Sequence, residues 1–311
     1  MGFDNRVTRM LGVGIPIVQA PMGWIARSAL ASAVSNAGAM GIIETSSGEL
    51  DVIREEIRRM RTLTEKPFGV NIAQAFVRDP KIADFVIEQG VRFVTTSAGS
   101  PTKYTKPLKE AGLTVFHVVP SLELAMKAVD AGVDGLVVEG GEGGGFKSHR
   151  EVSTLVLLPL VRSRVDVPII AAGGICDGVS MLAAFVLGAE GVQMGTRMVS
   201  AAESPVHPGW KQRILDAAET GTVLLKPAGA PALRALRTTR TSRLEAGEGN
   251  AMHALASGVH EVYFGGNVEA GVALTGQVAG RIDSVKPVAE IVRDTVREFE
   301  EAAERLAKTL R

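Results

Sequence analysis

The sequence has one cysteine, Cys176, in 311 residues, so an intrachain disulfide is excluded and a reducing cytoplasm is the expected compartment. It has no excess of charge of either sign, because 34 lysines and arginines balance 34 aspartates and glutamates. A general nucleic-acid binder needs a basic surface, so nucleic acid is not an expected partner. No stretch approaches the roughly 18 consecutive apolar residues of a membrane span, so a membrane-spanning helix is not expected. The N-terminal segment MGFDNRVTRMLGVGIP has an early acid and no cleavage site, so a signal peptide is not expected either.

Apolar material is plentiful: hydrophobic residues make up 46% of the chain and the mean hydropathy is +0.18, which excludes intrinsic disorder. Several of the 35 glycines share one setting, after a stretch with helical apolar spacing and before a run of β-formers. That setting is typical of the glycine that ends a helix in a left-handed conformation. It occurs at Gly38, Gly90, Gly112, Gly132 and Gly188. The repeat of helix, glycine and strand predicts βα units.

Eight short runs are apolar on both faces, as parallel strands covered by helices are. They are Ile15–Met22, Met40–Thr45, Phe68–Ala73, Phe93–Ser97, Thr114–Val119, Gly135–Glu139, Pro168–Ala172 and Gly191–Met194. The spacing between them leaves room for a crossover helix each time. This pattern predicts an α/β fold, a (β/α)₈ TIM barrel, with a doubly wound open sheet as the alternative.

The rhythm breaks after Thr196. We expect residues 1–199 and 266–311 to form the barrel and residues 200–265 to form a small helical insertion after the eighth strand, which acts as a lid over the substrate. The insertion includes an Ala/Arg-rich stretch, Ala228–Arg243. From Val285 the sequence predicts an amphipathic C-terminal helix whose charges form a solvated face.

Ligands of parallel barrels bind at the carboxyl ends of the strands, and phosphate commonly binds after the seventh and eighth. Here those ends carry Gly173-Gly174 and Gly195-Thr196, turns that lead into helices and expose backbone N–H groups to an anion. After the sixth strand, residues 139–145 contain five glycines in seven positions. This segment lacks the Rossmann spacing, and we interpret it as a loop that a ligand approaches closely.

Six segments in order along the chain resemble the FMN-dependent nitronate monooxygenase family, which includes FMN-containing enoyl-ACP reductases. They are QAPMG (19–23), GVNI (69–72), EGGEGGG (139–145), AAGGI (171–175), GVQMGTR (191–197) and GQVAG (276–280). The resemblance implies a TIM barrel with a small helical substrate domain and bound FMN. The implied cofactor-binding residues are Ala20, Pro21, Met22, Gly23, Asn71, Glu139, Gly144, Gly145, Gly173, Gly174, Gly195, Thr196 and Gln277. No metal is implied.

One departure concerns the chemistry. The family loop usually ends in a histidine that acts near the flavin, and here that position is Phe146, which cannot accept a proton. The candidates for proton transfer are Lys147 and His149 nearby, and Lys103 and Lys106 after the fourth strand. His117, inside the fifth strand, is either a further candidate or a core residue.

The segments Asn71–Pro80 and Phe93–Thr105 look closest to a branch of the family assigned to bacterial steroid-ring degradation, which acts on CoA thioesters. The substrate residues that we expect are Gln74, Phe146, Arg237 and Arg240. Arg234, Arg237, Arg240 and Arg243 recur every three residues. On a helix they would form one face, suited either to CoA phosphates or to salt bridges.

The sequence therefore predicts an FMN-dependent oxidoreductase that interconverts the single and α,β-double bond of a CoA thioester. NADH or NADPH, as a transient electron donor, would use the flavin face in turn with the substrate. One alternative is a nitronate monooxygenase that oxidises alkyl nitronates with FMN and O₂. Another is a flavin-free phosphate-binding barrel, such as an isomerase or synthase. Cys176 is either a small core residue or a thiol whose pKa the adjacent helix lowers. The sequence does not indicate an oligomeric state.

Overall fold

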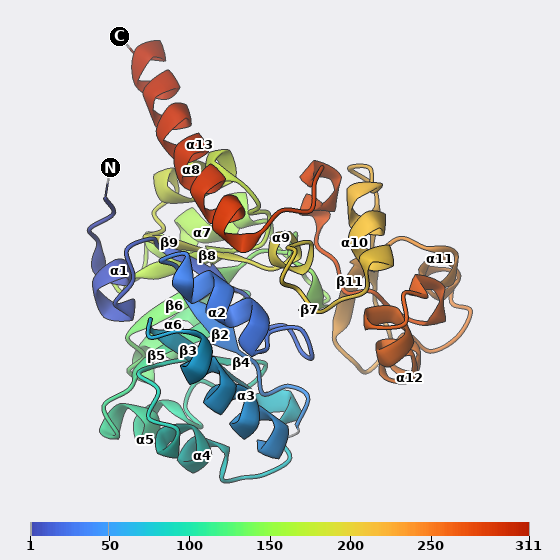
Figure 1. Ribbon diagram of the computed structural model, residues 1–311, viewed down its shortest axis with the longest axis horizontal. Helices are drawn as coiled ribbons and strands as arrows, with labels where there is room; N and C mark the ends of the chain where they lie inside the picture. Colours follow the sequence, from blue (N-terminus) through green and yellow to red (C-terminus); the bar gives the residue numbers. More distant parts are fainter. Residues whose placement is uncertain (1, 49, 311) are drawn as a thin grey trace.

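The computed structural model describes residues 2–48 and 50–310, and its main part is a barrel of parallel strands with helices outside it (Figure 1). Eight strands form one sheet in the order β1-β9-β8-β6-β5-β4-β3-β2. Their bounds are β1 Ile17–Gln19, β2 Gly41–Ile43, β3 Phe68–Ala73, β4 Phe93–Ser97, β5 Thr114–Val119, β6 Gly135–Glu139, β8 Ile169–Ala172 and β9 Gly191–Met194. All eight predicted strands are therefore confirmed, with several of them shorter than expected.

The sheet closes between its first and last strands, β1 and β2. Val18 forms a parallel bridge with Met40, and the backbone N–H of Gln19 donates to the carbonyl oxygen of Met40 at 3.0 Å. The Gln19 side chain adds to the closure, because its Oε1 accepts from the backbone N–H of Ile42 at 3.3 Å. This closure confirms the barrel and excludes the open doubly wound sheet.

The helices that follow the barrel strands end as the sequence predicts. Each of the five glycines has a positive φ, from +65° at Gly90 to +103° at Gly188. The helices of the barrel part are α1 Arg6–Leu11, α2 Ser28–Asn36, α3 Leu50–Leu63, α4 Ile82–Glu88, α5 Thr105–Glu110, α6 Leu122–Asp130, α7 Thr154–Arg162, α8 Gly178–Val186, α9 Thr196–Val199 and α13 Val288–Thr309, with short 3₁₀ helices η1 Gln74–Phe76, η2 Val268–Ala270 and η3 Gln277–Arg281.

Two layers of core hold the barrel together. Outside it, alternate strand residues such as Val70 and Val94 pack against α3 and α4. Inside it, Val18, Ile42 and Phe116 belong to a cluster that also contains Val7 and Leu11 of α1. The first helix therefore closes the amino-terminal end of the barrel, and the opposite end, which we call the mouth, is left for a ligand.

The insertion is not purely helical, which corrects the expectation for residues 200–265. Its elements are α10 Pro208–Leu215, β10 Thr222–Leu225, β11 Ala232–Leu236, α11 Thr239–Glu245 and α12 Ala251–Tyr263. Strand β11 pairs antiparallel with β10 and with β7, Gly145–Lys147, which directly follows the glycine-rich loop (residues 139–145). Because β7 comes from the barrel part of the chain, this small sheet joins the insertion to the mouth.

The arginine face expected on one helix does not exist. Arg234 lies in β11, Arg237 follows that strand, and Arg240 and Arg243 lie in α11. The alanine-rich stretch forms a strand because Leu233 and Ala235 bury one of its faces in a local core with Leu244 and Ala254. Tertiary packing here overrides the helical preference of alanine and arginine.

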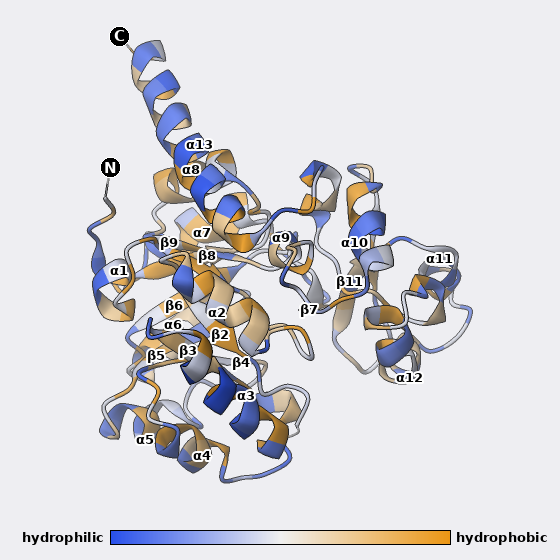
Figure 2. Cartoon of the chain, viewed as in Figure 1, coloured by the Kyte–Doolittle hydropathy of each residue, from blue (hydrophilic) through white to orange (hydrophobic). Residues whose placement is uncertain are grey.

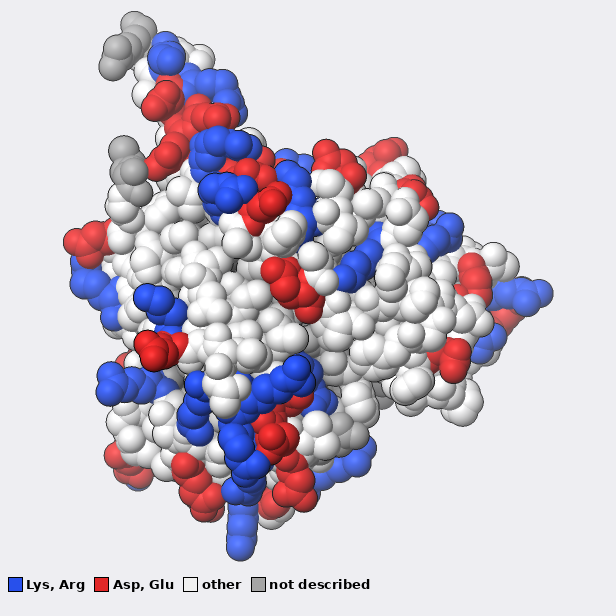
Figure 3. Space-filling model, viewed as in Figure 1, with Lys and Arg blue, Asp and Glu red and all other residues white. Residues whose placement is uncertain are grey.

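The C-terminal helix α13 is amphipathic, as predicted, and its far end extends past the body of the protein (Figures 1 and 2). Its apolar side packs against α8 and α2. On the face shown in Figure 3 the two signs of charge are mixed, and neither forms a large continuous patch. Among the described residues no helix is long and apolar enough to cross a membrane.

Candidate functional site

The mouth is lined by polar residues that alternate with core residues along the strands. Asn71 stands between Val70 and Ile72, which pack against the outer helices, so its own side chain points into the barrel. The same alternation turns Glu139 and Gln193 inward at the ends of β6 and β9. The barrel is therefore apolar in its lower part and polar at its mouth.

Asn71 is buried and held by β4. Its Nδ2 donates to Thr95 Oγ1 at 3.0 Å and to Ser97 Oγ at 3.3 Å. The Thr45 hydroxyl donates in turn to the backbone carbonyl of Asn71 at 2.8 Å. These bonds fix the amide at the edge of the mouth, where a ligand can reach it.

Gln193 carries a polar atom that lacks a partner in this part of the barrel. Its side chain is buried, and among the described residues its Oε1 has no hydrogen-bond partner. An unpaired buried amide oxygen is costly in free energy, about 1–3 kcal/mol. The position therefore suits a ligand that donates a hydrogen bond into the mouth.

Glu139 forms an ion pair with Lys147 across the glycine-rich loop. Lys147 Nζ lies 2.5 Å from Glu139 Oε1, and the lysine side chain is only 4% exposed. A solvated loop charge is the ordinary state of a lysine at such a position. Burial and pairing exclude that state for Lys147. The ion pair places Lys147, a predicted catalytic residue, beside Glu139, a predicted cofactor-binding residue.

The glycine-rich loop is held in place from two sides. The buried Arg234 donates from Nε to the carbonyl oxygen of Gly141 at 2.6 Å, and its guanidinium also pairs with Glu151. The Glu142 carboxylate accepts from the backbone N–H and the hydroxyl of Thr154, both at 2.9 Å, at the start of α7. Arg234 thus fixes the loop rather than a CoA phosphate.

Gly174 and Gly195, in the turns after β8 and β9, leave space above their backbone, whereas a Cβ on Gly173 would lie 2.9 Å from the carbonyl oxygen of Gly140. Gly173 and Gly174 have φ of +86° and +80°. A Cβ on Gly195 would have a single neighbour within 4 Å, the Cβ of Ala20 at 3.6 Å, and the three atoms nearest to a Cβ on Gly174 would belong to Glu142, at 3.7 Å or more. Thr196 beside them accepts at its Oγ1 from the backbone N–H of Gly276 at 2.9 Å. These turns form an open cradle lined by backbone.

Segment 20–24 follows β1 at the same edge. All five of its residues are half-buried, and Trp24 adopts a positive φ of 68°. The backbone N–H of Trp24 donates to the buried carboxylate of Glu44 at 3.3 Å, which helps to hold this strained turn. Ala20, Pro21, Met22 and Gly23 therefore stand on a fixed turn beside the cradle.

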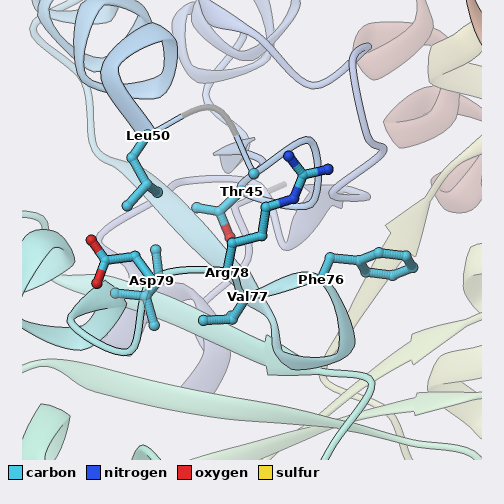
Figure 4. A pocket seen from close by; sticks show the side chains of 8 residues that line it. Thr45, Leu50, Phe76, Val77, Arg78 and Asp79 are labelled. Atoms are coloured by element: carbon cyan, nitrogen blue, oxygen red, sulfur yellow. The ribbon is translucent and has the colours of Figure 1, made fainter.

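Phe146 packs in a tilted arrangement against a second aromatic residue, which the sequence did not indicate. Its ring lies 5.1 Å from that of Phe76, which follows β3 in η1, and both rings are half-buried. Phe76 also borders a small hollow, which is lined as well by Thr45, Leu50, Val77, Arg78 and Asp79. Within this hollow Phe76 lies at the edge opposite to Leu50 and Asp79 (Figure 4). Gln74, the predicted substrate residue beside it, donates to the carbonyl oxygen of Ser100 at 2.9 Å.

Of the other predicted proton-transfer residues, three are exposed and one is buried outside the barrel. Lys103 is exposed over the ring of Tyr104, and Lys106 is exposed beside Glu110. His149 is exposed and contacts the carbonyl oxygen of Ala230. His117 faces the outer helices, where Thr96 Oγ1 lies 2.6 Å from its Nδ1, and burial lowers its pKa to about 4. It is a core residue.

The remaining predicted residues lie further out. Arg237 pairs with Glu245 on the surface, and the Arg240 Nε is buried with no hydrogen-bond partner among the described residues. Gln277 is exposed, but its backbone N–H donates to the Glu142 carbonyl at 2.9 Å, so it stays tied to the glycine-rich loop. Cys176 is buried, and burial raises its pKa to about 12 rather than lowering it, which favours the interpretation of Cys176 as a small core residue.

Comparisons with known proteins agree with this geometry. The model of the family described as nitronate monooxygenase matches residues 4–298. The chain is 36% identical to a Mycobacterium tuberculosis protein named (3aS,4S,5R,7aS)-5-hydroxy-7a-methyl-1-oxo-octahydro-1H-indene-4-carboxyl-CoA dehydrogenase, over 79% of this chain and 70% of that one. It is 31% identical to a probable nitronate monooxygenase of Staphylococcus saprophyticus, over 72% of this chain and 76% of that protein. The structure of FabK from Thermotoga maritima matches with a TM-score of 0.92 and 41% identity, over 98% of this chain and 99% of that one.

Proposed function

The chain belongs to the nitronate monooxygenase family, whose members are FMN-dependent oxidoreductases, and on that premise we propose that it binds FMN at the mouth and acts on the Cα–Cβ bond of an acyl-CoA thioester. The observation that carries the proposal is the open cradle at Gly174 and Gly195 beside the inward-facing Asn71 and Gln193. A phosphate fits the cradle and a flat polar ring fits the amides.

The residues at the mouth fit FMN on two grounds. The Gln193 Oε1 lacks a partner that a flavin N–H or a ribityl hydroxyl would supply, and a side chain on Gly195 would fill space that the cofactor needs. The phosphate would lie on Gly173, Gly174, Gly195 and Thr196, and the ring system beside Ala20–Gly23, Asn71, Glu139, Gly144 and Gly145. Bound FMN would supply a hydride acceptor or donor for the substrate β-carbon.

A thioester suits this site better than a small nitronate. The half-buried Phe146 packs against Phe76, and the pair offers an apolar surface but no proton acceptor. An acyl group with rings or branches would contact that surface. The Mycobacterium tuberculosis relative carries in its name such a substrate, a bicyclic carboxyl-CoA. NADH or NADPH would reduce the flavin in turn with the substrate.

Nitronate oxidation is the second candidate, favoured by the family match and by the relative in Staphylococcus saprophyticus. Anaerobic mixing of the FMN-loaded protein with acyl-CoA thioesters, propionate 3-nitronate, NADH and NADPH separates the two, because each productive donor bleaches the flavin absorbance. We expect bleaching by a saturated cyclic acyl-CoA and little by the nitronate. Bleaching by the nitronate alone would reverse the assignment.

A further inference from the structure

Two lysines are buried in the described part of the chain, and their ammonium groups are satisfied differently. Lys211 Nζ donates to three backbone carbonyls, those of Ala201 at 2.6 Å, Ser204 at 2.9 Å and Ala202 at 3.2 Å. All three of its donors are used, so Lys211 is a structural residue that ties a loop to α10. Its burial has an explanation within the fold.

Lys147 has no such explanation. Among the residues that the structure describes, the Glu139 carboxylate is the single hydrogen-bond partner of its Nζ. An ammonium has three N–H donors, and leaving donors of a buried charge unpaired is unfavourable. Two donors of Lys147 are therefore available for a group that does not belong to the chain.

Glycine at position 143 leaves room for the ion pair beneath the loop. A Cβ on Gly143 would lie 2.8 Å from both Glu139 Oε1 and Lys147 Nζ. Lys147 projects from the same side of the small sheet as Arg234, opposite to Phe146, because neighbouring residues of a strand alternate in direction. The ammonium therefore lies on the side of β7 that carries the contact with Glu139 at the end of β6, and the phenyl ring lies on the opposite side, against Phe76 after β3 and the local core of the insertion.

From this arrangement we infer that Lys147 hydrogen-bonds the carbonyl oxygen of the substrate thioester and that Glu139 is the residue that positions it. The inference rests on the proposed function. When a solvent base takes the Cα proton of a thioester, the electron pair of the broken C–H bond moves onto that oxygen to form an enolate. A positively charged donor stabilises the enolate more than the neutral thioester, which is how such a group accelerates the reaction. The same hydrogen bond polarises an α,β-unsaturated thioester for hydride addition at the β-carbon.

The other predicted cations differ from Lys147 in their surroundings. Arg234 is committed to Gly141 and Glu151, and Lys103, Lys106 and His149 are exposed. Among these five residues, Lys147 alone combines burial with unused donors.

Acetoacetyl-CoA is a suitable probe because it forms an enolate with a distinct ultraviolet absorbance and gives its α-proton to the buffer. The FMN-loaded wild type, Lys147→Met, Lys147→Arg and the exposed control Lys127→Met would be saturated with it at one fixed pH. We expect the enolate fraction to fall about tenfold in Lys147→Met and less in Lys147→Arg. The kcat for the thioester found to bleach the flavin should fall about 100-fold in Lys147→Met. The FMN affinity of Lys147→Met should stay unchanged. Lys127→Met should keep both the FMN affinity and the enolate fraction of the wild type.

An enolate fraction unaffected by Lys147→Met would overturn the inference. A loss of FMN affinity in that variant with the enolate fraction intact would also overturn it. Either result would make Lys147 a structural or cofactor-binding residue. If Lys147→Met does not fold, the double variant Glu139→Gln/Lys147→Met removes the unpaired carboxylate and permits the same measurement. A wild type that binds FMN but not acetoacetyl-CoA would instead contradict the proposed thioester substrate.

Discussion

Arg234 Nε donates to the carbonyl oxygen of Gly141 at 2.6 Å, which joins strand β11 of the small sheet to the glycine-rich loop at the barrel mouth. The same guanidinium donates to Glu151 Oε2 at 2.8 Å. The insertion therefore does more than cover the barrel, because it fixes the backbone on which the proposed cofactor and substrate residues stand.

Replacing Arg234 with alanine should destabilise the protein and weaken FMN binding together. The change leaves a buried carbonyl oxygen and part of a carboxylate unpaired, at a cost of about 1–3 kcal/mol in the free energy of unfolding. Chemical denaturation and FMN titration would measure both effects. Arg58→Ala, which removes an exposed pair with Glu55, is the control and should change stability by less than about 0.5 kcal/mol. Equal effects of the two substitutions would contradict the anchoring role.

Gly195→Ala should separate cofactor binding from stability. The new methyl group has room in the fold, and the φ of Gly195, −102°, is open to any residue. We therefore expect the free energy of unfolding without FMN to change by less than about 0.5 kcal/mol, while the methyl group fills the cradle and lowers FMN affinity about tenfold. Gly14→Ala, at a glycine with no atom within 4 Å of the added Cβ, should change neither quantity. Unaltered FMN affinity in Gly195→Ala would place the phosphate elsewhere.

Phe146→His should shift the activity towards nitronates. An imidazole restores a proton acceptor at this position and removes part of the aromatic contact with Phe76. We expect oxygen consumption with propionate 3-nitronate to rise about tenfold or more and kcat/KM for the thioester to fall. Phe146→Leu, which lacks a proton acceptor, should lose thioester activity without gaining nitronate activity. A gain in both variants would show that size rather than proton transfer governs the choice.

His117 should make stability depend on pH. Its pKa in the folded protein is about 4, below the ordinary value of 6.5, so the unfolded chain takes up the proton first as the pH falls. This contribution to stability is complete above pH 6.5 and is lost between 6.5 and about 4, a change of about 3 kcal/mol at most. Urea unfolding at pH 7 and pH 4.5 would measure it, and the non-titrating His117→Gln should show a smaller difference. An equal difference in both proteins would assign the effect to other groups.

The strands and helices of the barrel could be predicted from the sequence because their signals are local. The five helix-ending glycines and the eight apolar runs each depend on a few neighbouring residues. The closing Val18–Met40 bridge joins residues of two strands that an open parallel sheet would also contain, so closure could not be predicted from these signals. The glycine turns at 173–174 and 195 could be found, since ligand sites of such barrels lie at known strand ends.

The small sheet and the ion pair could not be predicted in this way. Strand β11 pairs with β7 across more than 80 residues of chain, and the local preference of its alanines and arginines is helical. The burial of Lys147 depends on that pairing and on a loop that returns it to Glu139. Gln193 did lie within a recognised motif, GVQMGTR, but only its place inside the closed barrel reveals an unpaired oxygen.

The most direct measurement for the central claim is a crystal structure of the protein grown with excess FMN. The account predicts the phosphate on the backbone of Gly174 and Gly195 and the flavin ring beside Asn71 and Gln193, with the amide oxygen of Gln193 accepting a hydrogen bond. A mouth without FMN, or one closed by side chains of the glycine-rich loop and β7, would contradict it.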